Sequence, residues 1–267
     1  MSQLLEGKTA LILGVANRWS LAYAIARAFI REHAEVILTY QGDRQKQTVE
    51  ELAAELKASQ VFPCDVTQDA QLDALANGLK GQETVLDAVV HSVAFANRED
   101  LSRPFVETSR AGFALAQDVS AYSLVAVAHA TAPLMAPKRD GSPGGGSLTT
   151  LTYLGSTRVV ENYNVMGVAK AALEASVRYL AADLGPSNIR VNAISAGPVK
   201  TTSARGVRDF SKILDGGAKL APLRRNTDPA EVADTAVFLA SDLGRGVTGN
   251  VIYVDAGIQI MGFALAQ

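Results

Sequence analysis

Residues 8–30 read KTALILGVANRWSLAYAIARAFI and join a strand-like run to a helix-like run through one short turn. The apolar run from Lys8 to Leu13 is typical of a strand that a parallel sheet buries on both faces. Gly14 follows it and supplies a close turn, and from Leu21 to Ile30 apolar residues recur at helical spacing. The segment therefore predicts the first strand, turn and helix of an α/β fold.

The same alternation continues along the chain. Further strands are expected at 34–40, 60–65, 85–90, 147–152, 189–194 and 251–255. Helices are expected at 44–56, 69–79, 107–135, from about 163 to 184, and 229–240. Seven strands with intervening helices predict a Rossmann-type, doubly wound parallel sheet with helices on both faces. The region from 195 to about 227 is expected to be irregular.

Composition limits the other possibilities. With 48% hydrophobic residues and no linker-like break, residues 1–267 are expected to form one domain with a large core. The formal net charge of −2 gives no reason to expect nucleic acid as a partner. A single cysteine, Cys64, and three scattered histidines predict neither an intramolecular disulfide nor a metal site. Without a secretion signal, and with its longest apolar run (122–136) too short to span a bilayer, the protein is predicted to be cytoplasmic and not membrane-bound.

Ligands of such sheets bind beyond the carboxyl ends of the strands, so the residues just after each strand are the candidates for function. After the first strand, Ser20 can cap the helix whose free N–H groups would face a pyrophosphate. The usual glycine-rich fingerprint is only partly present, because Ser20 and Ala22 stand where glycines are common. A capped loop without a ligand is the alternative. The candidate cofactor residues of this turn are Gly14, Ala16, Ser20 and Leu21.

The end of the second strand normally selects the dinucleotide. An acidic residue there binds ribose hydroxyls, and an arginine accommodates a 2′-phosphate. Here Gln41 is neutral and can hydrogen-bond a ribose, which favours NADH, whereas Arg44 leaves NADPH open. A solvated strand end is the plainer interpretation of Gln41.

The third and fourth strand ends add further candidates. Asp65 and Val66 could hold an adenine edge, although Asp65 could equally cap a helix. Small residues after the fourth strand would let a dinucleotide pass close to the backbone, and Phe95 would lie at the mouth of the pocket. His91 is expected to be a hydrogen-bonded core histidine. The cofactor candidates of the fourth strand end are Ser92, Val93 and Ala94.

After the sixth strand, a Gly-Pro turn can present backbone groups to a nicotinamide carboxamide, and Thr201 could bind the pyrophosphate. The region 197–227 is too long for a plain connector and carries apolar residues, which favours a substrate-binding lid. The cofactor candidates here are Gly197, Pro198, Val199 and Thr201, and the lid candidates are Phe210 and Ile213.

The segment from Tyr153 to Lys170 supplies the chemistry. Tyr163 and Lys170 are seven positions apart, about two helical turns, so both can face one crevice. A phenol and an ammonium on one face form a proton-donating site if they lie beside a cofactor. Without one they are ordinary surface residues.

These residues resemble a known family. Nearly the whole chain, from Gly7 to Gly257, resembles the short-chain dehydrogenase/reductase superfamily, and within it the enoyl-acyl carrier protein reductases of bacterial fatty acid synthesis. Most of that superfamily places tyrosine and lysine four residues apart. The six residues between Tyr163 and Lys170, the earlier Tyr153, and the run NYNVMG at 162–167 carry the closer resemblance. Ala94, where glycine is expected, and Glu161 are departures from the pattern.

The resemblance implies hydride transfer from NADH to the β-carbon of a trans-2-enoyl thioester. It implies that Tyr163 donates a hydrogen bond to the developing enolate, that Lys170 holds the nicotinamide ribose, and that Tyr153 lies over the substrate. It further implies acyl carrier protein as the partner and a homotetramer. Arg208 and Lys212 flank Phe210 and could attract the acidic carrier, although exposed basic residues are usually only solvated. The implied substrate-binding residues are Ala94, Phe95, Tyr153, Tyr163, Met166, Phe210 and Ile213.

Two alternatives remain. A carbonyl or 3-ketoacyl reductase of the same superfamily would place a serine about thirteen residues before its tyrosine and a lysine four after, where this chain has Thr150 and Gly167. A non-catalytic NAD(P)-binding regulator would more plausibly lack one member of the tyrosine–lysine pair, and both are present.

Overall fold

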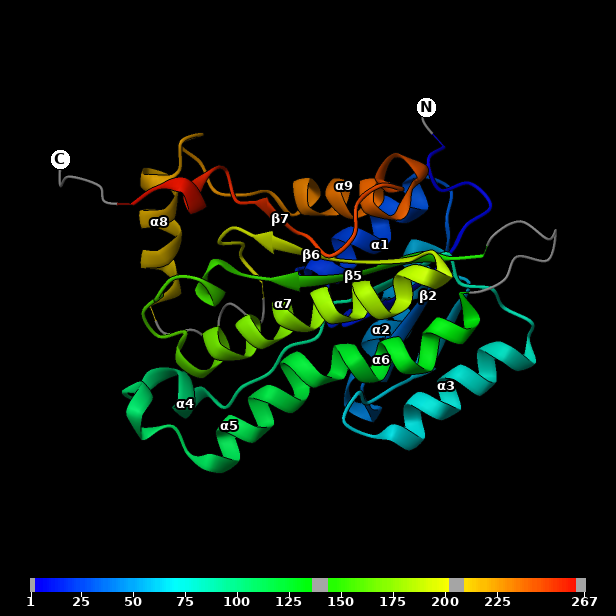
Figure 1. Ribbon diagram of the computed structural model, residues 1–267, viewed down its shortest axis with the longest axis horizontal. Coiled ribbons are helices and arrows are strands. Elements are labelled where there is room, and N and C mark those ends of the chain that lie inside the picture. Colours follow the sequence, from blue (N-terminus) through cyan, green and yellow to red (C-terminus); the bar gives the residue numbers. More distant parts are fainter. Residues whose placement is uncertain (1–2, 136–143, 202–208, 263–267) are drawn as a thin grey trace.

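Parallel strand pairing joins seven strands in the order β3-β2-β1-β4-β5-β6-β7. Figure 1 shows the computed structural model, which describes residues 3–135, 144–201 and 209–262. The strands are β1 Thr9–Leu13, β2 Glu35–Tyr40, β3 Gln60–Pro63, β4 Ala88–His91, β5 Gly146–Thr152, β6 Ile189–Ala196 and β7 Val251–Val254. The chain reverses its direction of travel across the sheet between β1 and β4, so a crevice opens at their carboxyl ends.

Helices cover both faces of the sheet (Figure 1). α1 Leu21–Arg31, α2 Asp43–Leu56 and α9 Pro229–Ala240 pack into one core cluster. α3 Asp69–Gly81, α6 Ser123–Thr131 and α7 Asn164–Leu184 pack into a second. In β1, Ile12 belongs to the first cluster and Leu11 and Leu13 to the second, because successive side chains of a strand point to opposite faces. The two cores share one sheet and form one domain.

The remaining elements are short or lie near the carboxyl edge. The α-helices are α4 Arg98–Ser102, α5 Arg110–Gln117 and α8 Phe210–Leu220, and η2 Asp118–Tyr122 is a π-helical turn. The 3₁₀ turns are η1 Phe105–Glu107, η3 Ala132–Leu134, η4 Leu154–Ser156, η5 Gly185–Ser187, η7 Asp242–Gly244 and η8 Ile258–Ile260. Figure 1 shows α4 and α8 beside the carboxyl ends of the strands.

The predicted α/β sheet of seven strands is confirmed, with three differences. The segment expected to be irregular, 195–227, contains α8, whose Phe210, Ile213, Leu214 and Gly217 recur at helical spacing. Gly216 and Gly217 weaken the helical signal in the sequence. The segment expected as one helix, 107–135, becomes helical at Arg110 and is interrupted by the π turn η2. The third difference is α4, which lies where a loop was expected.

The Arg110–Leu134 segment is the one described helix long and apolar enough, by length and composition, to cross a membrane. Of its most apolar window, 56% is buried inside the protein. Leu124 and Val127 belong to the core cluster with α7, so this segment packs as a core helix.

Candidate active site

A cavity of about 560 Å³ lies at the carboxyl ends of β1, β4, β5 and β6. α4, the start of α7 and α8 contribute side chains to its wall. Most of the predicted cofactor and substrate residues line it. These are Gly14, Ala16, Ser20, Leu21, Ser92, Val93, Ala94, Phe95, Tyr153, Tyr163, Met166, Lys170, Gly197, Pro198, Val199, Thr201, Phe210 and Ile213.

The turn after β1 forms one end of the cavity. Gly14 has a φ of +96°, which favours glycine, and a β-carbon there would collide with the carbonyl oxygen of Ser92. The ends of β1 and β4 therefore meet backbone to backbone. Ser20 caps α1 by accepting a hydrogen bond from the Tyr23 N–H, at 3.3 Å, and its hydroxyl donates to the Asn17 carbonyl, at 2.7 Å. The N-terminus of α1 is thus presented to the cavity, as an anion-binding turn requires.

Two tyrosines meet at the other end of the cavity. The rings of Tyr153 and Tyr163 pack edge to face, with centroids 5.0 Å apart and planes at 66°. Gly155 makes room for Tyr163, because a β-carbon at Gly155 would collide with that ring. Burial raises the pKa of both phenols, helped by Asp255 at Tyr153 and by Tyr153 and then Glu174 at Tyr163. Both side chains are therefore neutral hydrogen-bond donors at physiological pH.

Lys170 lies on α7 against β5 and is 5% exposed. Its Nζ donates to the Leu151 carbonyl oxygen at 2.8 Å. Burial lowers the pKa of Lys170 to about 8, and the carboxylate of Glu174 opposes that shift. The ammonium is therefore held in the wall of the cavity, and the pH at which it loses its proton lies close to the physiological range.

His91 is the hydrogen-bonded core histidine that the sequence predicts. Its Nδ1 lies 2.9 Å from Thr150 Oγ1 and its Nε2 lies 2.8 Å from Ser123 Oγ. Burial, together with the positive charge of Lys170, lowers the pKa of His91 to about 3. His91 is thus neutral at physiological pH and joins β4 to β5 and α6 through its two ring nitrogens.

Three predicted cofactor residues lie outside this cavity: Gln41, Asp65 and Val66. They follow β2 and β3, which lie beyond β1 on the sheet. The Gln41 amide donates to Asp65 Oδ2 at 3.1 Å, and Asp65 Oδ1 accepts from the backbone and hydroxyl of Thr67. Burial opposes ionisation of Asp65, but these hydrogen bonds outweigh it and lower the Asp65 pKa. Asp65 thus organises the turn that leads into α3.

The structure adds residues that the sequence reasoning missed. Ser120, on the π turn, is fully buried and holds the strand-end residue Phe95 at both backbone groups. The Phe95 N–H donates to Ser120 Oγ at 2.9 Å, and that hydroxyl donates to the Phe95 carbonyl at 3.0 Å. The sequence signal that could have indicated Ser120 is its place as a polar residue within a long apolar helical segment. Further lining residues not predicted are Asn17, Ala96, Asn97, Arg98, Leu101, Leu151, Thr152, Val160 and Ala196.

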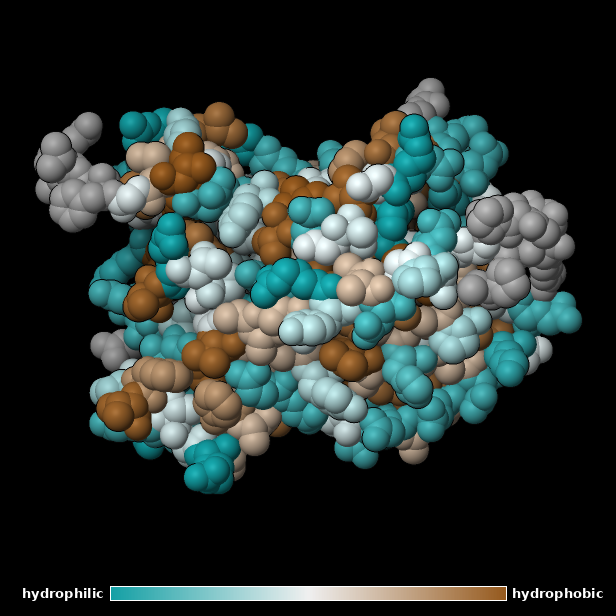
Figure 2. Space-filling model, viewed as in Figure 1, coloured by the Kyte–Doolittle hydropathy of each residue, from teal (hydrophilic) through white to brown (hydrophobic). Residues whose placement is uncertain are grey.

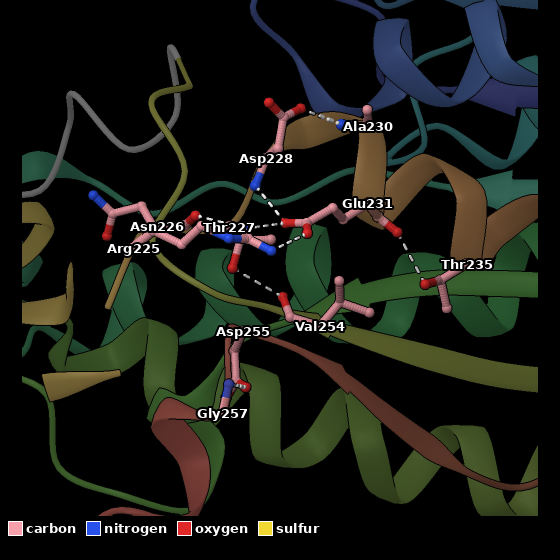
Figure 3. Close-up of polar contacts among 10 residues, drawn as sticks. All are labelled: Arg225, Asn226, Thr227, Asp228, Ala230, Glu231, Thr235, Val254, Asp255 and Gly257. Atoms are coloured by element: carbon pink, nitrogen blue, oxygen red, sulfur yellow. Dashed lines mark hydrogen bonds and ion pairs between the residues drawn. The ribbon is translucent and has the colours of Figure 1, made fainter. Parts of the chain in front are cut away.

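The Gly-Pro turn after β6 packs against the end of the segment that joins α8 to α9. A β-carbon at Gly197 would collide with Thr227 Oγ1, and that hydroxyl donates to the Val254 carbonyl at 3.2 Å. Figure 3 shows this anchor beside a second one, in which Arg225 donates to both carboxylate oxygens of Glu231, at 2.8 and 2.6 Å. The chain leaving α8 is therefore attached to the ends of β7 and α9.

The comparisons with known proteins agree with this geometry. Residues 14–259 match the sequence profile of the family described as Enoyl-(Acyl carrier protein) reductase. The chain is 54% identical over 262 residues to the enoyl-acyl-carrier-protein reductase (NADH) FabI of Bacillus cereus, a match that covers 97% of this chain and 100% of that protein. The chain belongs to the enoyl-acyl carrier protein reductase family.

Solved structures of this family have the same fold. A Bacillus cereus enoyl-acyl carrier protein reductase with NADP⁺ and an indole naphthyridinone superposes with a TM-score of 0.93 at 54% identity, covering 98% of this chain and 100% of that chain. An Anaplasma phagocytophilum reductase in complex with NAD gives a TM-score of 0.93 at 45% identity, covering 100% and 99%. The Staphylococcus aureus (strain MRSA252) relative, 49% identical with 95% and 97% covered, is named as NADPH-dependent. Both dinucleotides thus occur among the reductases that this chain resembles.

Proposed function

We propose that the chain is an NADH-dependent enoyl-acyl carrier protein reductase, which reduces the C=C bond of a trans-2-enoyl thioester in the last step of the fatty acid elongation cycle. The observation that carries the proposal is the packed pair of Tyr153 and Tyr163 beside the buried ammonium of Lys170, in one cavity at the carboxyl edge of the sheet.

The residues present fit a nicotinamide dinucleotide. The capped N-terminus of α1 beside Gly14 suits a pyrophosphate, and the Gly-Pro turn at 197–198 brings backbone groups to the cavity. Lys170 has three N–H donors, of which the Leu151 carbonyl accepts one, and it lines the cavity where ribose hydroxyls would lie. When bound, the reduced cofactor supplies hydride to the β-carbon of the substrate.

Tyr163 stabilises the charge that this reduction creates. As the β-carbon gains hydride, the electron pair of the C=C bond moves toward the thioester carbonyl, and its oxygen becomes an enolate oxygen. A positioned donor in a dry site stabilises such an oxyanion strongly. The Tyr163 phenol is protonated and packed in place, so it donates that hydrogen bond, and Lys170 adds positive charge nearby. The α-carbon then takes a proton from Tyr163, from Tyr153 or from a water.

The acyl chain occupies the apolar part of the cavity. Phe210 and Ile213 belong to α8, so the region 197–227 is proposed to act as the substrate-binding lid. The other proposed acyl-chain contacts are Ala94, Phe95 and Met166.

Selection of the cofactor is assigned to the end of β2. Gln41 is neutral and bonded to Asp65, an arrangement that suits ribose hydroxyls and offers no positive charge to a 2′-phosphate. NADH is therefore the proposed cofactor, and Arg44 is the residue through which NADPH would be used.

The proposed partners are acyl carrier protein and three further copies of the chain, in the cytoplasm. Lys212 faces solvent but is paired with Asp209 at 3.2 Å, which reduces its attraction for an acidic carrier, and Arg208 lies outside the described residues. Figure 2 shows apolar side chains exposed on the face covered by α4 to α7. On α5, η2 and α7 the large side chains of Phe113, Tyr122 and Tyr179 are exposed. Such exposure supports burial of these elements in a homotetramer.

The experiment is a paired assay on crotonyl-coenzyme A and acetoacetyl-coenzyme A, each with NADH and with NADPH. We expect oxidation of NADH with crotonyl-coenzyme A. Turnover of acetoacetyl-coenzyme A alone would assign a carbonyl reductase instead. Cofactor binding without turnover of either compound, or of a carrier-bound enoyl substrate, would indicate a regulator.

A further inference from the structure

Glu174 is a buried carboxylate to which no part of the proposed chemistry gives a role. It is 7% exposed, one turn beyond Lys170 on the same face of α7. A carboxylate is rarely buried unless it is paired, because removing it from water is costly. Its burial beside the site therefore needs an explanation.

The end of β5 holds both charged groups through adjacent residues. The Leu151 carbonyl accepts from Lys170 Nζ at 2.8 Å, and the Thr152 hydroxyl donates to Glu174 Oε1 at 2.7 Å. Leu151 and Thr152 also line the cavity. The strand that forms the cavity wall thus fixes the ammonium and the carboxylate in one arrangement.

The other titratable groups around Lys170 do not supply the negative charge that it needs. His91, from β4, is neutral because its pKa is lowered to about 3. Tyr153 and Tyr163 are neutral because burial raises their pKa values. Asp255, after β7, acts on Tyr153 and already accepts from the backbone N–H groups of Gly257 and Gln259. Glu174 is the carboxylate that acts on Lys170.

We infer that Glu174 is a positioning residue for the reductase: its carboxylate, held by Thr152, keeps Lys170 charged in the wall of the cavity. The inference rests on the proposed function, in which the charged Lys170 binds the cofactor ribose. Glu174 itself does not line the cavity. Its effect passes through Lys170, so it should change the pH range of cofactor binding more than the contacts with the substrate.

The test is the affinity for NADH, measured by fluorescence titration from about pH 6 to about pH 10, a range that spans the lowered pKa of Lys170. The variants are Glu174→Gln, which keeps an acceptor for Thr152, and Asp183→Asn, which removes an exposed carboxylate from the same helix as a control. We expect affinity in the wild type to fall with a midpoint near the Lys170 pKa of about 8. In Glu174→Gln the midpoint should move down by about one to two pH units, and in Asp183→Asn it should not move.

A second variant guards against loss of folding. The pair Glu174→Leu with Thr152→Val removes both hydrogen-bond partners together and leaves neither one unsatisfied. It should show the same downward shift of the midpoint. If the wild type binds NADH normally and the folded variants show no shift in the pH midpoint of NADH affinity, the role of Glu174 is overturned and the proposed function is not. A wild type that fails to bind NADH or to reduce crotonyl-coenzyme A would overturn the proposed function, and the inference with it.

Discussion

Replacing Tyr163 by phenylalanine removes one oxygen atom from the site and leaves its packing in place. The ring still packs edge to face on Tyr153, 5.0 Å away, and still fills the space left by Gly155. Because burial raises the pKa of Tyr163, essentially every wild-type molecule carries the donor proton at neutral pH. The variant therefore tests what the Tyr163 hydroxyl donates to the substrate, without disturbing the packing of the ring.

Loss of one preorganised oxyanion donor costs about 2.7–4 kcal/mol of transition-state stabilisation, or about a hundredfold to a thousandfold in kcat. We expect that loss for Tyr163→Phe in the reduction of crotonyl-coenzyme A, with NADH affinity changed less than about twofold, since Lys170 is untouched. The thermal midpoint should stay close to that of the wild type. Tyr153→Phe is the matched control, because it removes the same atom from the ring's packing partner. A kcat within about threefold of the wild type for folded Tyr163→Phe would refute the assignment.

Four further outcomes follow from the same contacts. Lys170→Met should weaken NADH binding about tenfold or more in a fluorescence titration; unaltered affinity would count against the ribose contact. The pKa of His91 falls from 6.5 to about 3 on folding, so the unfolded chain binds the extra proton first. The contribution of His91 to the free energy of unfolding is therefore fully present above pH 6.5 and is lost as the pH falls toward 3. Denaturant titrations should show a loss of about 2 kcal/mol between pH 7.5 and about pH 5. His91→Gln should flatten this dependence on pH. Burial raises the pKa of Cys64 to about 12, so an aromatic disulfide reagent should label it only after unfolding, and rapid labelling of the native protein would contradict its placement. Asp228→Ala should cost about 1 kcal/mol of unfolding free energy, since Asp228 and Glu231 form a capping box at α9; no change would show the box to be dispensable.

The fold could be predicted because its signals are local. Each strand of a parallel sheet is an apolar run of a few residues, and each helix repeats every three to four residues. The predicted and observed bounds of the helix at 229–240 coincide, and Ser20 caps α1 as expected. The prediction failed where local signals are weak, as in α8 with its two adjacent glycines and in the five-residue α4.

The site was predictable only in part, for a different reason. The strand-end rule identifies residues that point into the crevice from their place in the chain, and it found the turns at Gly14 and Gly197. It gives no information on residues that act through another residue. Ser120 and Glu174 lie within helices, and their roles depend on which strand end packs against them. Contacts between residues far apart in the sequence cannot be predicted from the spacing of residues along the chain.

The spacing of the tyrosine and lysine is explained by the turn at Gly155. A lysine four residues after Tyr163 would stand at position 167, where even a β-carbon would lie 2.7 Å from the Gly155 carbonyl oxygen. That approach is too close, so only glycine fits at 167 while η4 packs on α7 in this way. Three residues further along the same helical face, the side chain at 170 reaches the Leu151 carbonyl and has Glu174 one turn beyond it. A lysine at position 167, the arrangement typical of carbonyl reductases, is thus excluded here by contact with the backbone of Gly155.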